Sequence, residues 1–250
     1  FKNYNNDKRN RIFGYSSLNY KFNDWVSAKT KVSIDSYTEV QNERIAIGSV
    51  DQSSFSSYTR QSQELNYDFM LNFNKTFDNF SITGIAGANA RRNTVESVYG
   101  ATVGGLVVPD LWAISNSVSP VYVSESLALW GTNSIYASVS FGYKDFWYID
   151  LTDRYDISST LPEGDNGFNY YSASTSLLLS ELDFFKELPV LSFLKLRANY
   201  AEVGNDAPVY SLNPTYSKGT NWGSNALFSV NSTLLNPNLL PERTKSFELG

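Results

Sequence analysis

The chain contains neither cysteine nor histidine. It therefore cannot assemble a Ser-His-Asp triad or a Cys-His pair, and it offers no thiolate or imidazole ligands for zinc. Disulfide bonds are excluded as well, so cysteine pairing gives no information about the redox compartment. These two absences remove most nucleophilic and zinc chemistry from consideration.

Basic runs and long apolar runs are scarce too. The formal net charge of the 250 residues is -5, and the nearest approach to a basic cluster, at 8–11, is short and follows an acidic residue. A nucleic-acid surface needs clustered Lys and Arg, so none is expected here. No apolar run reaches the roughly 20 residues of a membrane helix. A transmembrane barrel would show no such run, because only alternate residues of its strands face lipid.

Aromatic residues, in contrast, are abundant: 17 Tyr, 16 Phe and 5 Trp make up 15% of the chain. Their rings pack well on pleated sheets. The dominant pattern is also that of strands, since apolar and polar residues alternate with period two. The clearest segment is 64–74, where Leu65, Tyr67, Phe69, Leu71 and Phe73 alternate with mainly polar neighbours. The fold class predicted is therefore all-β.

Further strands are predicted along the rest of the chain. Strong alternation occurs at 25–38, 134–143, 147–154 and 194–200, and weaker strands are expected near 10–22, 79–92 and 168–179, with another from about 243. The segment 181–188 is expected to form one or two helical turns before Pro189 ends it.

The connections between the strands alternate in length. Tight turns flanked by aromatic residues are predicted at 22–24, 77–79 and 143–145, and long polar loops at about 40–59, 93–131, 157–167 and 204–241. Short periplasmic turns and long extracellular loops are typical of outer-membrane barrels. The aromatic residues around the tight turns would form a girdle at the membrane interface, although rings that close a core near hairpins remain an alternative.

Alternation alone does not decide which face is outside. In a soluble sandwich the apolar face is the core, whereas in a membrane barrel it meets lipid and the polar face lines a wet lumen. Charged residues on the polar faces of successive strands (Lys29, Lys31, Asp35, Glu64, Asp68, Asp150, Arg154, Lys195 and Arg197) favour the barrel.

Four segments, in the same order, resemble the SusC/RagA-type TonB-dependent transporters of Bacteroidetes: 5–35, 134–162, 194–206 and 236–250. The second is similar to the family's pattern Y-x-Y-K-D-K-Y-x-L-x-x-x-x-R-x-D-x-S-S, the third to L-K-L-R-x-S-Y-G-x-x-G-N and the fourth to N-P-x-L-K-P-E-x-T-x-S-x-E-x-G. The residues that match the second pattern are Tyr143, Lys144, Asp145, Arg154, Asp156, Ser158 and Ser159. Departures are modest: Ala201 stands where Gly is common, and Tyr155 replaces the usual neighbour of Asp156.

The resemblance implies a segment of an antiparallel transmembrane β-barrel of roughly 22 strands. We expect residues 1–250 to be part of that barrel domain, from its middle portion, without the plug domain or a signal peptide. The expected location is the outer membrane of a Gram-negative bacterium. The expected partners are a SusD-like surface lipoprotein, outer-membrane lipid, and the TonB complex acting through the absent plug.

The function implied is TonB-energised import of oligosaccharides or peptides. The alternative from another class is a soluble, secreted all-β binding module that uses aromatic loops; a siderophore or vitamin receptor would share the barrel but has no support from these motifs. No enzyme activity, cofactor or metal is expected. Asp153, Asp156 and Glu163 are expected to be solvated acids, and the segment 164–167 a turn rather than a calcium loop.

Substrate contacts are expected from aromatic residues in the long loops, whose rings can stack on sugars or hold peptide side chains. The alternative is that these rings pack against other loops or a lipoprotein lid. The candidates are Trp112, Tyr122, Trp130, Tyr210, Tyr216 and Trp222. Arg154 and Arg197 are predicted to face the lumen, where each could pair with a plug carboxylate.

Overall fold

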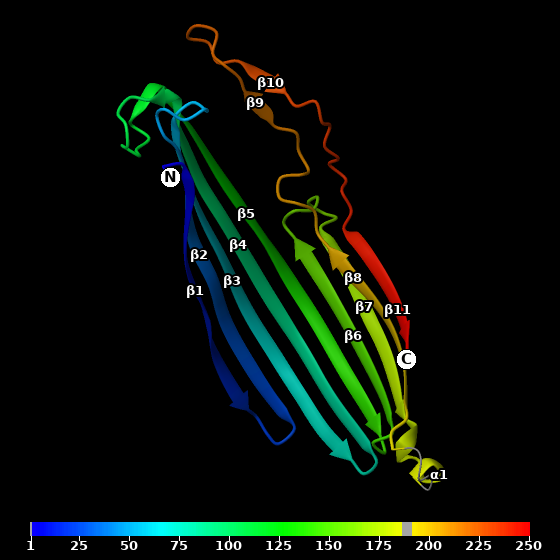
Figure 1. Cartoon of the computed structure of the whole chain (residues 1–250). Helices are drawn as coiled ribbons and strands as arrows, with labels where there is room; N and C mark the ends of the chain where they lie inside the picture. The colour runs from blue at the N-terminus through cyan, green and yellow to red at the C-terminus, as the bar shows by residue number, and fades with distance from the viewer. Residues whose placement is uncertain (1, 187–191) are drawn as a thin grey trace. The chain divides into compact units, whose positions relative to one another are not determined.

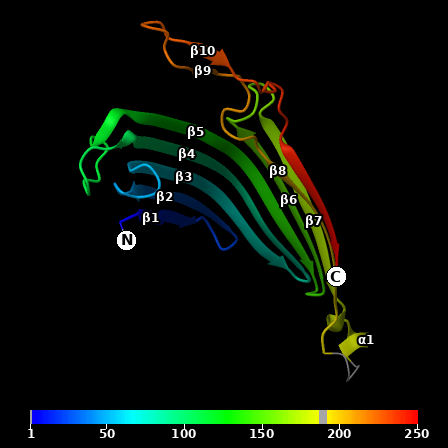
Figure 2. The same ribbon diagram turned by 45° about the horizontal axis from the view of Figure 1, so that its top comes forward.

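The computed structural model describes residues 2–186 and 192–250, and most of them belong to one sheet. Nine strands are hydrogen-bonded in the order β1-β2-β3-β4-β5-β6-β7-β8-β11, so that strands β1 to β8 follow the chain order and β11 pairs with β8 (Figures 1 and 2). These strands are β1 (Tyr4–Lys21), β2 (Val26–Ile45), β3 (Ser54–Phe77), β4 (Phe80–Leu106), β5 (Ser117–Tyr143), β6 (Trp147–Ser158), β7 (Gly167–Leu178), β8 (Lys195–Asn205) and β11 (Glu242–Leu249). The predicted all-β class is confirmed.

The connection between β8 and β11 carries a small hairpin of its own. Strands β9 (Tyr216–Lys218) and β10 (Phe228–Val230) pair antiparallel with each other and not with the main sheet. Two short helices, η1 (Leu179–Glu181) and α1 (Asp183–Lys186), lie between β7 and β8, within or beside the segment predicted to be helical. The predicted end of that helix at Pro189 lies outside the described residues. No helix in the described part of the chain is long and apolar enough to cross a membrane.

The described residues divide into two compact units. The first is drawn from 1–16, 32–66 and 91–130, and it contains the parts of β1 to β5 next to the connections 46–53 and 107–116. The second is drawn from 17–31, 67–90 and 131–250, and it contains the other parts of β1 to β5 together with β6 to β11.

In the first unit, side chains hold the two connections in place. The Leu106 backbone N–H donates to Ser53 Oγ at 3.0 Å. The Asn116 amide closes its own connection by donating to the carbonyl oxygens of Val108 and Leu111, both at 2.8 Å. Backbone groups that have left the sheet are therefore satisfied by nearby side chains, as buried or semi-buried loops require.

In the second unit, the hairpin turns are as tight as predicted. Lys144 and Asp145 have positive φ angles of 47° and 57°, and the Phe146 N–H donates to the Tyr143 carbonyl at 3.1 Å. Positive φ at both central residues is the signature of the type I′ turn, whose twist matches that of the flanking strands. The register between β5 and β6 pairs Tyr143 with Trp147, so three residues, 144–146, connect the two strands.

Two of the predicted long loops are much shorter than expected. The predicted loops 40–59 and 93–131 shrink to 46–53 and 107–116, because β2 to β5 continue far into them. The predictions were wrong because they relied on alternation. In β5, for example, Val121, Tyr122 and Val123 follow one another, so the period of two is lost although the strand continues. The predicted loops 157–167 and 204–241 agree with the structure to within two residues at each end.

The sheet buries little of its own apolar surface. Among the described residues, the buried apolar side chains are those of Ala46, Phe55, Leu106, Leu161 and Phe168. Large apolar residues of the strands stay exposed instead, such as Phe69 at 47% and Ile135 at 62%. A water-soluble domain of this length would bury such side chains, so these faces must meet another apolar medium.

Gly87 in β4 is predicted to be essential for the close approach of its neighbours. A Cβ atom at this position would lie 2.6 Å from Tyr136 Cζ and 2.8 Å from the Phe69 carbonyl oxygen. We expect Gly87→Ala to lower the free energy of unfolding of the full-length protein by about 1–3 kcal/mol, because a backbone atom has to shift. Gly14→Ala is the matched control, since a Cβ there has no neighbour within 4 Å. Equal stability of the two variants in denaturant unfolding would contradict the packing described.

Candidate functional site

One face of the sheet in the second unit is lined by polar side chains. The register of β5 and β6 sets Ser134 opposite Asp156, Tyr136 opposite Arg154, and Ser140 opposite Asp150. The register of β6 and β7 continues the row, with Tyr170 opposite Arg154. Residues that lie opposite each other in adjacent strands point to the same face, so these side chains form one continuous polar surface.

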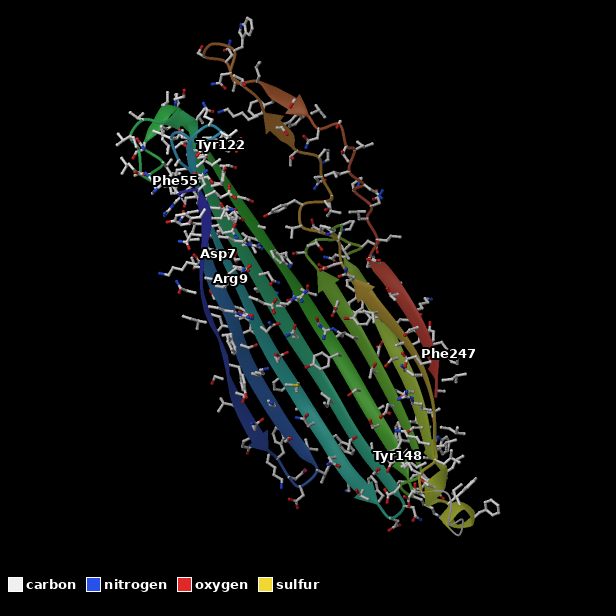
Figure 3. All side chains as sticks on the ribbon, in the orientation of Figure 1. Asp7, Arg9, Phe55, Tyr122, Tyr148 and Phe247 are labelled. Atoms are coloured by element: carbon white, nitrogen blue, oxygen red, sulfur yellow. The ribbon has the colours of Figure 1, made fainter. Side chains whose placement is uncertain are left out.

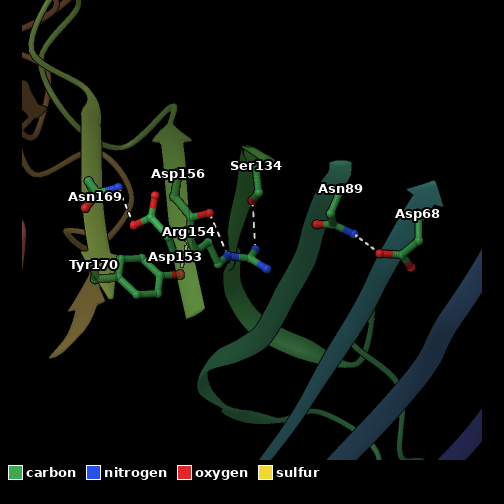
Figure 4. Close-up of polar contacts among 8 residues, drawn as sticks. All are labelled: Asp68, Asn89, Ser134, Asp153, Arg154, Asp156, Asn169 and Tyr170. Carbon is green, nitrogen blue, oxygen red and sulfur yellow. Dashed lines mark hydrogen bonds and ion pairs between the residues drawn. The ribbon is translucent and has the colours of Figure 1, made fainter. Parts of the chain in front are cut away.

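Arg154 is the centre of a hydrogen-bonded network on this surface (Figure 4). Its Nε donates to Asp156 Oδ1 and its Nη2 to Ser134 Oγ, both at 2.8 Å. The guanidinium also lies 5.5 Å from the centre of the Tyr136 ring. The Tyr170 hydroxyl donates to the other carboxylate oxygen of Asp156 at 2.6 Å. Arg154 thus lies on the polar face, as the alternation predicted, and its charge is already paired with Asp156.

Other carboxylates on the same face are also bound by a neighbouring strand. The Asn89 amide on β4 donates to Asp68 on β3 at 2.7 Å (Figure 4). Asp150 accepts from Ser140 and, at 3.1 Å, from Ser174. These carboxylates are therefore hydrogen-bonded to neutral donors on the neighbouring strands, as polar groups in a sheet require.

Arg197, the second arginine predicted to face the lumen, lies on β8 opposite Ser176. Its backbone exchanges hydrogen bonds with Gly250. Its guanidinium has no ion pair among the residues that the structure describes. Arg197 therefore differs from Arg154, since its charge is not neutralised by a neighbour in this part of the chain.

The opposite face of the second unit is apolar and rich in rings. Aromatic pairs gather beside the tight turns, with ring centres 4.9 Å apart for Tyr20 and Phe22, 5.4 Å for Trp25 and Phe73, and 4.7 Å for Phe80 and Tyr143. Trp147 belongs to the same set, and its indole Nε1 donates to Thr175 Oγ1 at 2.9 Å. A ring with an apolar body and one satisfied polar atom is suited to a membrane interface.

The first unit also has charged side chains on its strands. Arg9 Nη2 donates to Glu39 Oε1 at 2.9 Å, and Arg11 forms a bidentate pair with Asp35. The Tyr37 ring lies between two guanidinium groups, with Arg9 at 4.9 Å and Arg60 at 5.9 Å from its centre. Figure 3 labels Arg9 on β1.

Three of the six aromatic candidates, Trp112, Tyr122 and Trp130, lie in the first unit. The Trp112 ring lies 5.6 Å from the Arg44 guanidinium, which also covers the Tyr4 ring at 4.8 Å. Tyr122 and Trp130 lie in β5 and not in a loop, and the Tyr122 ring is 6.0 Å from that of Tyr99. Packing between loop and strand therefore accounts for Trp112.

The other three aromatic candidates lie in the second unit, in the connection from β8 to β11. Tyr216 begins β9, and Trp222 exchanges backbone hydrogen bonds of 2.9 and 3.0 Å with Asn225 at the end of that hairpin. Both side chains are more than two-thirds exposed. Tyr210 has a φ angle of 62° and, with Ser159 and Asn213, helps to line a cavity of about 270 Å³. The structure thus does not gather the six rings into one site.

One polar cluster was not predicted. Ser158 is fully buried, and its hydroxyl donates to Asp206 Oδ2 at 2.5 Å and lies 3.0 Å from Thr160 Oγ1. The cluster joins the end of β6 to the end of β8, where two long connections begin. Its members lie in two of the segments whose sequence resembles the family, 134–162 and 194–206. That resemblance was the one sign in the sequence that these residues have a structural role.

The Arg154 network is predicted to stabilise the sheet. We expect Arg154→Ala to lower the free energy of unfolding of the full-length protein by about 2 kcal/mol, because Asp156, whose side chain is 10% exposed, would lose its charged partner. Arg11→Ala is the matched control. Its pair with Asp35 is much more exposed, so a smaller loss than that of Arg154→Ala is expected. Denaturant unfolding in detergent measures both, and a larger loss for Arg11→Ala would refute the assignment.

Glu39 gives a pH-dependent prediction. Glu39 lies outside the membrane-spanning part of β2. It comes thirteen residues after Val26, where the strand begins, and a strand crosses a membrane with about 9–11 residues. Hydrogen bonds from Gln41 and then Arg9 hold the pKa of the Glu39 carboxyl below its ordinary value of 4.5. The stabilisation is therefore fully present above pH 4.5 and is lost as the pH falls further. Glu39→Gln should flatten the stability profile of the full-length protein below pH 4.5; an unchanged profile would contradict this role.

Comparison with known proteins identifies the kind of chain to which these faces belong. No family model matches. The curated TonB-dependent receptor P39 of Formosa agariphila is 29% identical over 157 residues, covering 56% of this chain and 14% of that protein. TonB-dependent receptor P26 of the same organism is 27% identical over 185 residues, covering 69% of this chain and 18% of that protein. The chain therefore spans less than a fifth of these relatives.

Solved structures agree in fold. A structure of the RagAB peptide transporter matches 96% of this chain and 28% of its own, with a TM-score of 0.81 and 16% identity. The RagAB peptide importer in its "closed-closed" state matches 97% of this chain and 28% of its own, with a TM-score of 0.80. The sequence similarity to the two receptors and the backbone similarity to RagAB both agree with a sheet that has one polar and one apolar face. The resemblance seen in the sequence is therefore supported: the chain is similar to TonB-dependent receptors of Formosa agariphila, and its antiparallel sheet has the fold of part of the RagAB transporter, as expected for a segment of an outer-membrane β-barrel.

Proposed function

We propose that the protein containing this chain imports oligosaccharides or peptides across the outer membrane with energy supplied through TonB. The observation that carries the proposal is the two-faced sheet. Its apolar face suits lipid, and its other face is a row of paired acids, hydroxyls and Arg154 that suits a hydrated interior. The relatives' names, TonB-dependent receptors, support the energy source.

The comparisons bear on the substrate class in only one case. The RagAB structures are described as those of a peptide transporter and importer, whereas the curated relatives' names specify no substrate. Peptides and oligosaccharides are therefore both retained. We propose that all 250 residues belong to the barrel domain, that a plug domain connects the barrel to the TonB complex, and that a SusD-like lipoprotein covers the outer opening.

Within this chain, Tyr216 and Trp222 are the best placed of the six aromatic candidates to touch a substrate. Both are exposed on the connection between β8 and β11, and within the described residues neither ring pairs with another ring or lies under a cation. Aromatic faces of this kind bind sugar rings and apolar peptide side chains. Trp112, in contrast, is proposed to be a packing residue, because Arg44 covers its ring.

The experiment is uptake by cells that carry the full-length protein. Fluorescent oligopeptides and oligosaccharides, each too large for general porins, are offered separately. We expect one class to accumulate and its accumulation to stop when the gene is deleted or TonB is removed. Accumulation that persists without TonB would overturn the proposal.

The variant Tyr216→Ala/Trp222→Ala tests the residue assignment in the same assay. We expect it to raise the half-saturating concentration of the transported class about tenfold, while the amount of protein in the membrane is unchanged. Trp112→Ala is the matched control, which should alter thermal stability and leave half-saturation unchanged. The reverse pattern would reject these two residues as substrate contacts.

A further inference from the structure

The second unit contains a cavity between two of its surface connections. One connection, 159–166, joins β6 to β7, and the other begins after β8 and leads to β9; the two lie side by side beyond the ends of these strands (Figures 1 and 2). The cavity has a volume of about 270 Å³. Its lining residues are Ser159, Thr160, Tyr210, Leu212, Asn213 and Thr215. Strands that the structure describes bound both connections, so the lining comes from complete segments of the chain.

Hydrogen bonds hold the first wall of the cavity in place. Ser159 donates its backbone N–H to the Gly131 carbonyl oxygen at 3.0 Å, and its hydroxyl oxygen accepts from the Gly131 N–H at 2.9 Å. Thr160 is 5% exposed, and its backbone nitrogen and its hydroxyl oxygen lie 3.3 and 3.0 Å from the Ser158 hydroxyl oxygen. This wall is therefore preformed, which lowers the entropic cost of binding a ligand.

The opposite wall, 210–215, has a strained backbone at one residue. Tyr210 has a φ angle of 62°, a left-handed conformation that bulky residues rarely adopt. Tyr210 is also 62% exposed, so its ring is accessible to a ligand. Strained conformations of this kind cluster at ligand-binding sites, where they serve to position a side chain.

The lining has the chemistry of a site for a neutral, hydroxylated ring. None of the lining residues is charged, and all except Leu212 carry a hydroxyl or an amide. The Asn213 amide and the Thr215 hydroxyl have no hydrogen-bond partner among the described residues, and both side chains are exposed. Hydroxyls and amides donate as well as accept, as the hydroxyls of a sugar do. The Tyr210 ring and Leu212 supply apolar surface for the C–H face of such a ring.

The size and charge of the cavity favour one neutral sugar. Sites that enclose a whole drug-sized ligand have volumes of about 300–1,000 Å³, so a cavity just below this range holds one part of a longer substrate. A peptide fits less well, because each of its units presents one N–H and one C=O, and its charged ends would find no charged partner in the lining. An acidic sugar would find no cation either, and Asp206, which is bound to Ser158 next to this wall, has the same sign.

We propose that this cavity binds one neutral pyranose ring of the imported substrate, an inference that rests on the proposed function and narrows its substrate to oligosaccharides. The sugar lies against the Tyr210 ring, and its hydroxyls bond to Asn213 and Thr215. Thr215 directly precedes Tyr216, whose exposed ring receives the next sugar of the oligosaccharide.

The test measures binding by the full-length protein, purified in detergent, to an array of immobilised oligomers. The array carries neutral oligosaccharides, oligosaccharides that bear uronate or sulfate groups, and oligopeptides. We expect the wild type to bind neutral oligosaccharides. An array on which no neutral oligosaccharide is bound, whatever else is, would overturn the proposal.

Two tryptophan substitutions assign the binding to the cavity. Asn213→Trp fills the cavity and removes the amide, so the affinity for the bound neutral oligosaccharide should fall by about tenfold or more. Asn238→Trp is the matched control, at an exposed position of the same connection that lies outside the lining, and it should leave the affinity unchanged. Equal affinities of the two variants would contradict the assignment.

Tyr210→Gly separates ligand binding from misfolding. Glycine adopts a positive φ without strain, so the thermal stability should stay unchanged or rise, whereas loss of the ring should weaken the affinity about tenfold. An unchanged affinity in this variant would overturn the role of the ring and with it the site.

Uptake by cells distinguishes this site from the import function. If Asn213→Trp abolishes binding of a neutral oligosaccharide that cells do not take up with TonB, the import function fails and the site stands. TonB-dependent uptake of a neutral oligosaccharide that Asn213→Trp leaves unchanged would overturn the site and leave the import function intact.

Discussion

The hydrogen-bonded ladder between neighbouring strands is the constraint on which the rest of this structure depends. A barrel wall is one layer thick, so its backbone N–H and C=O groups must pair within the sheet wherever no water is available. Strand length, register and turn type are all consequences. The ladder between β5 and β6 pairs Tyr143 with Trp147, and that register decides which side chains share a face.

Because the layer is single, its two faces meet different media, and each has its own energetics. On the apolar face, rings such as Trp147 satisfy their single polar atom locally, here through Thr175. On the polar face, several charged groups are held by a donor or acceptor on the next strand, as Arg154 is by Ser134 and Asp68 is by Asn89. A slip of one residue would exchange the two faces, so both media oppose a change of register.

Much of this architecture could be predicted from the sequence, because lipid on one side and water on the other impose a period of two. The tight turns, the faces of β3, β5 and β6, and the position of Arg154 all followed from it. The outer parts of β2 to β5 did not. Where both faces meet water, or where Val121 to Val123 are apolar in succession, the ladder continues without any periodic signal. The Ser158 cluster was missed for a different reason: a short polar motif shows that residues matter, but not which distant residue, here Asp206, they contact.

The buried bond between Ser158 and Asp206 has a consequence for how such a protein can diversify. It ties together the ends of β6 and β8, where two long connections begin, and the Ser158 side chain has no exposure to solvent. The segment between Asp206 and the start of β11 can then change in length and composition without disturbing the register of the strands on either side. One contiguous segment between two fixed strand ends can therefore be replaced as a unit, and a change of specificity would need changes in only one stretch of the gene.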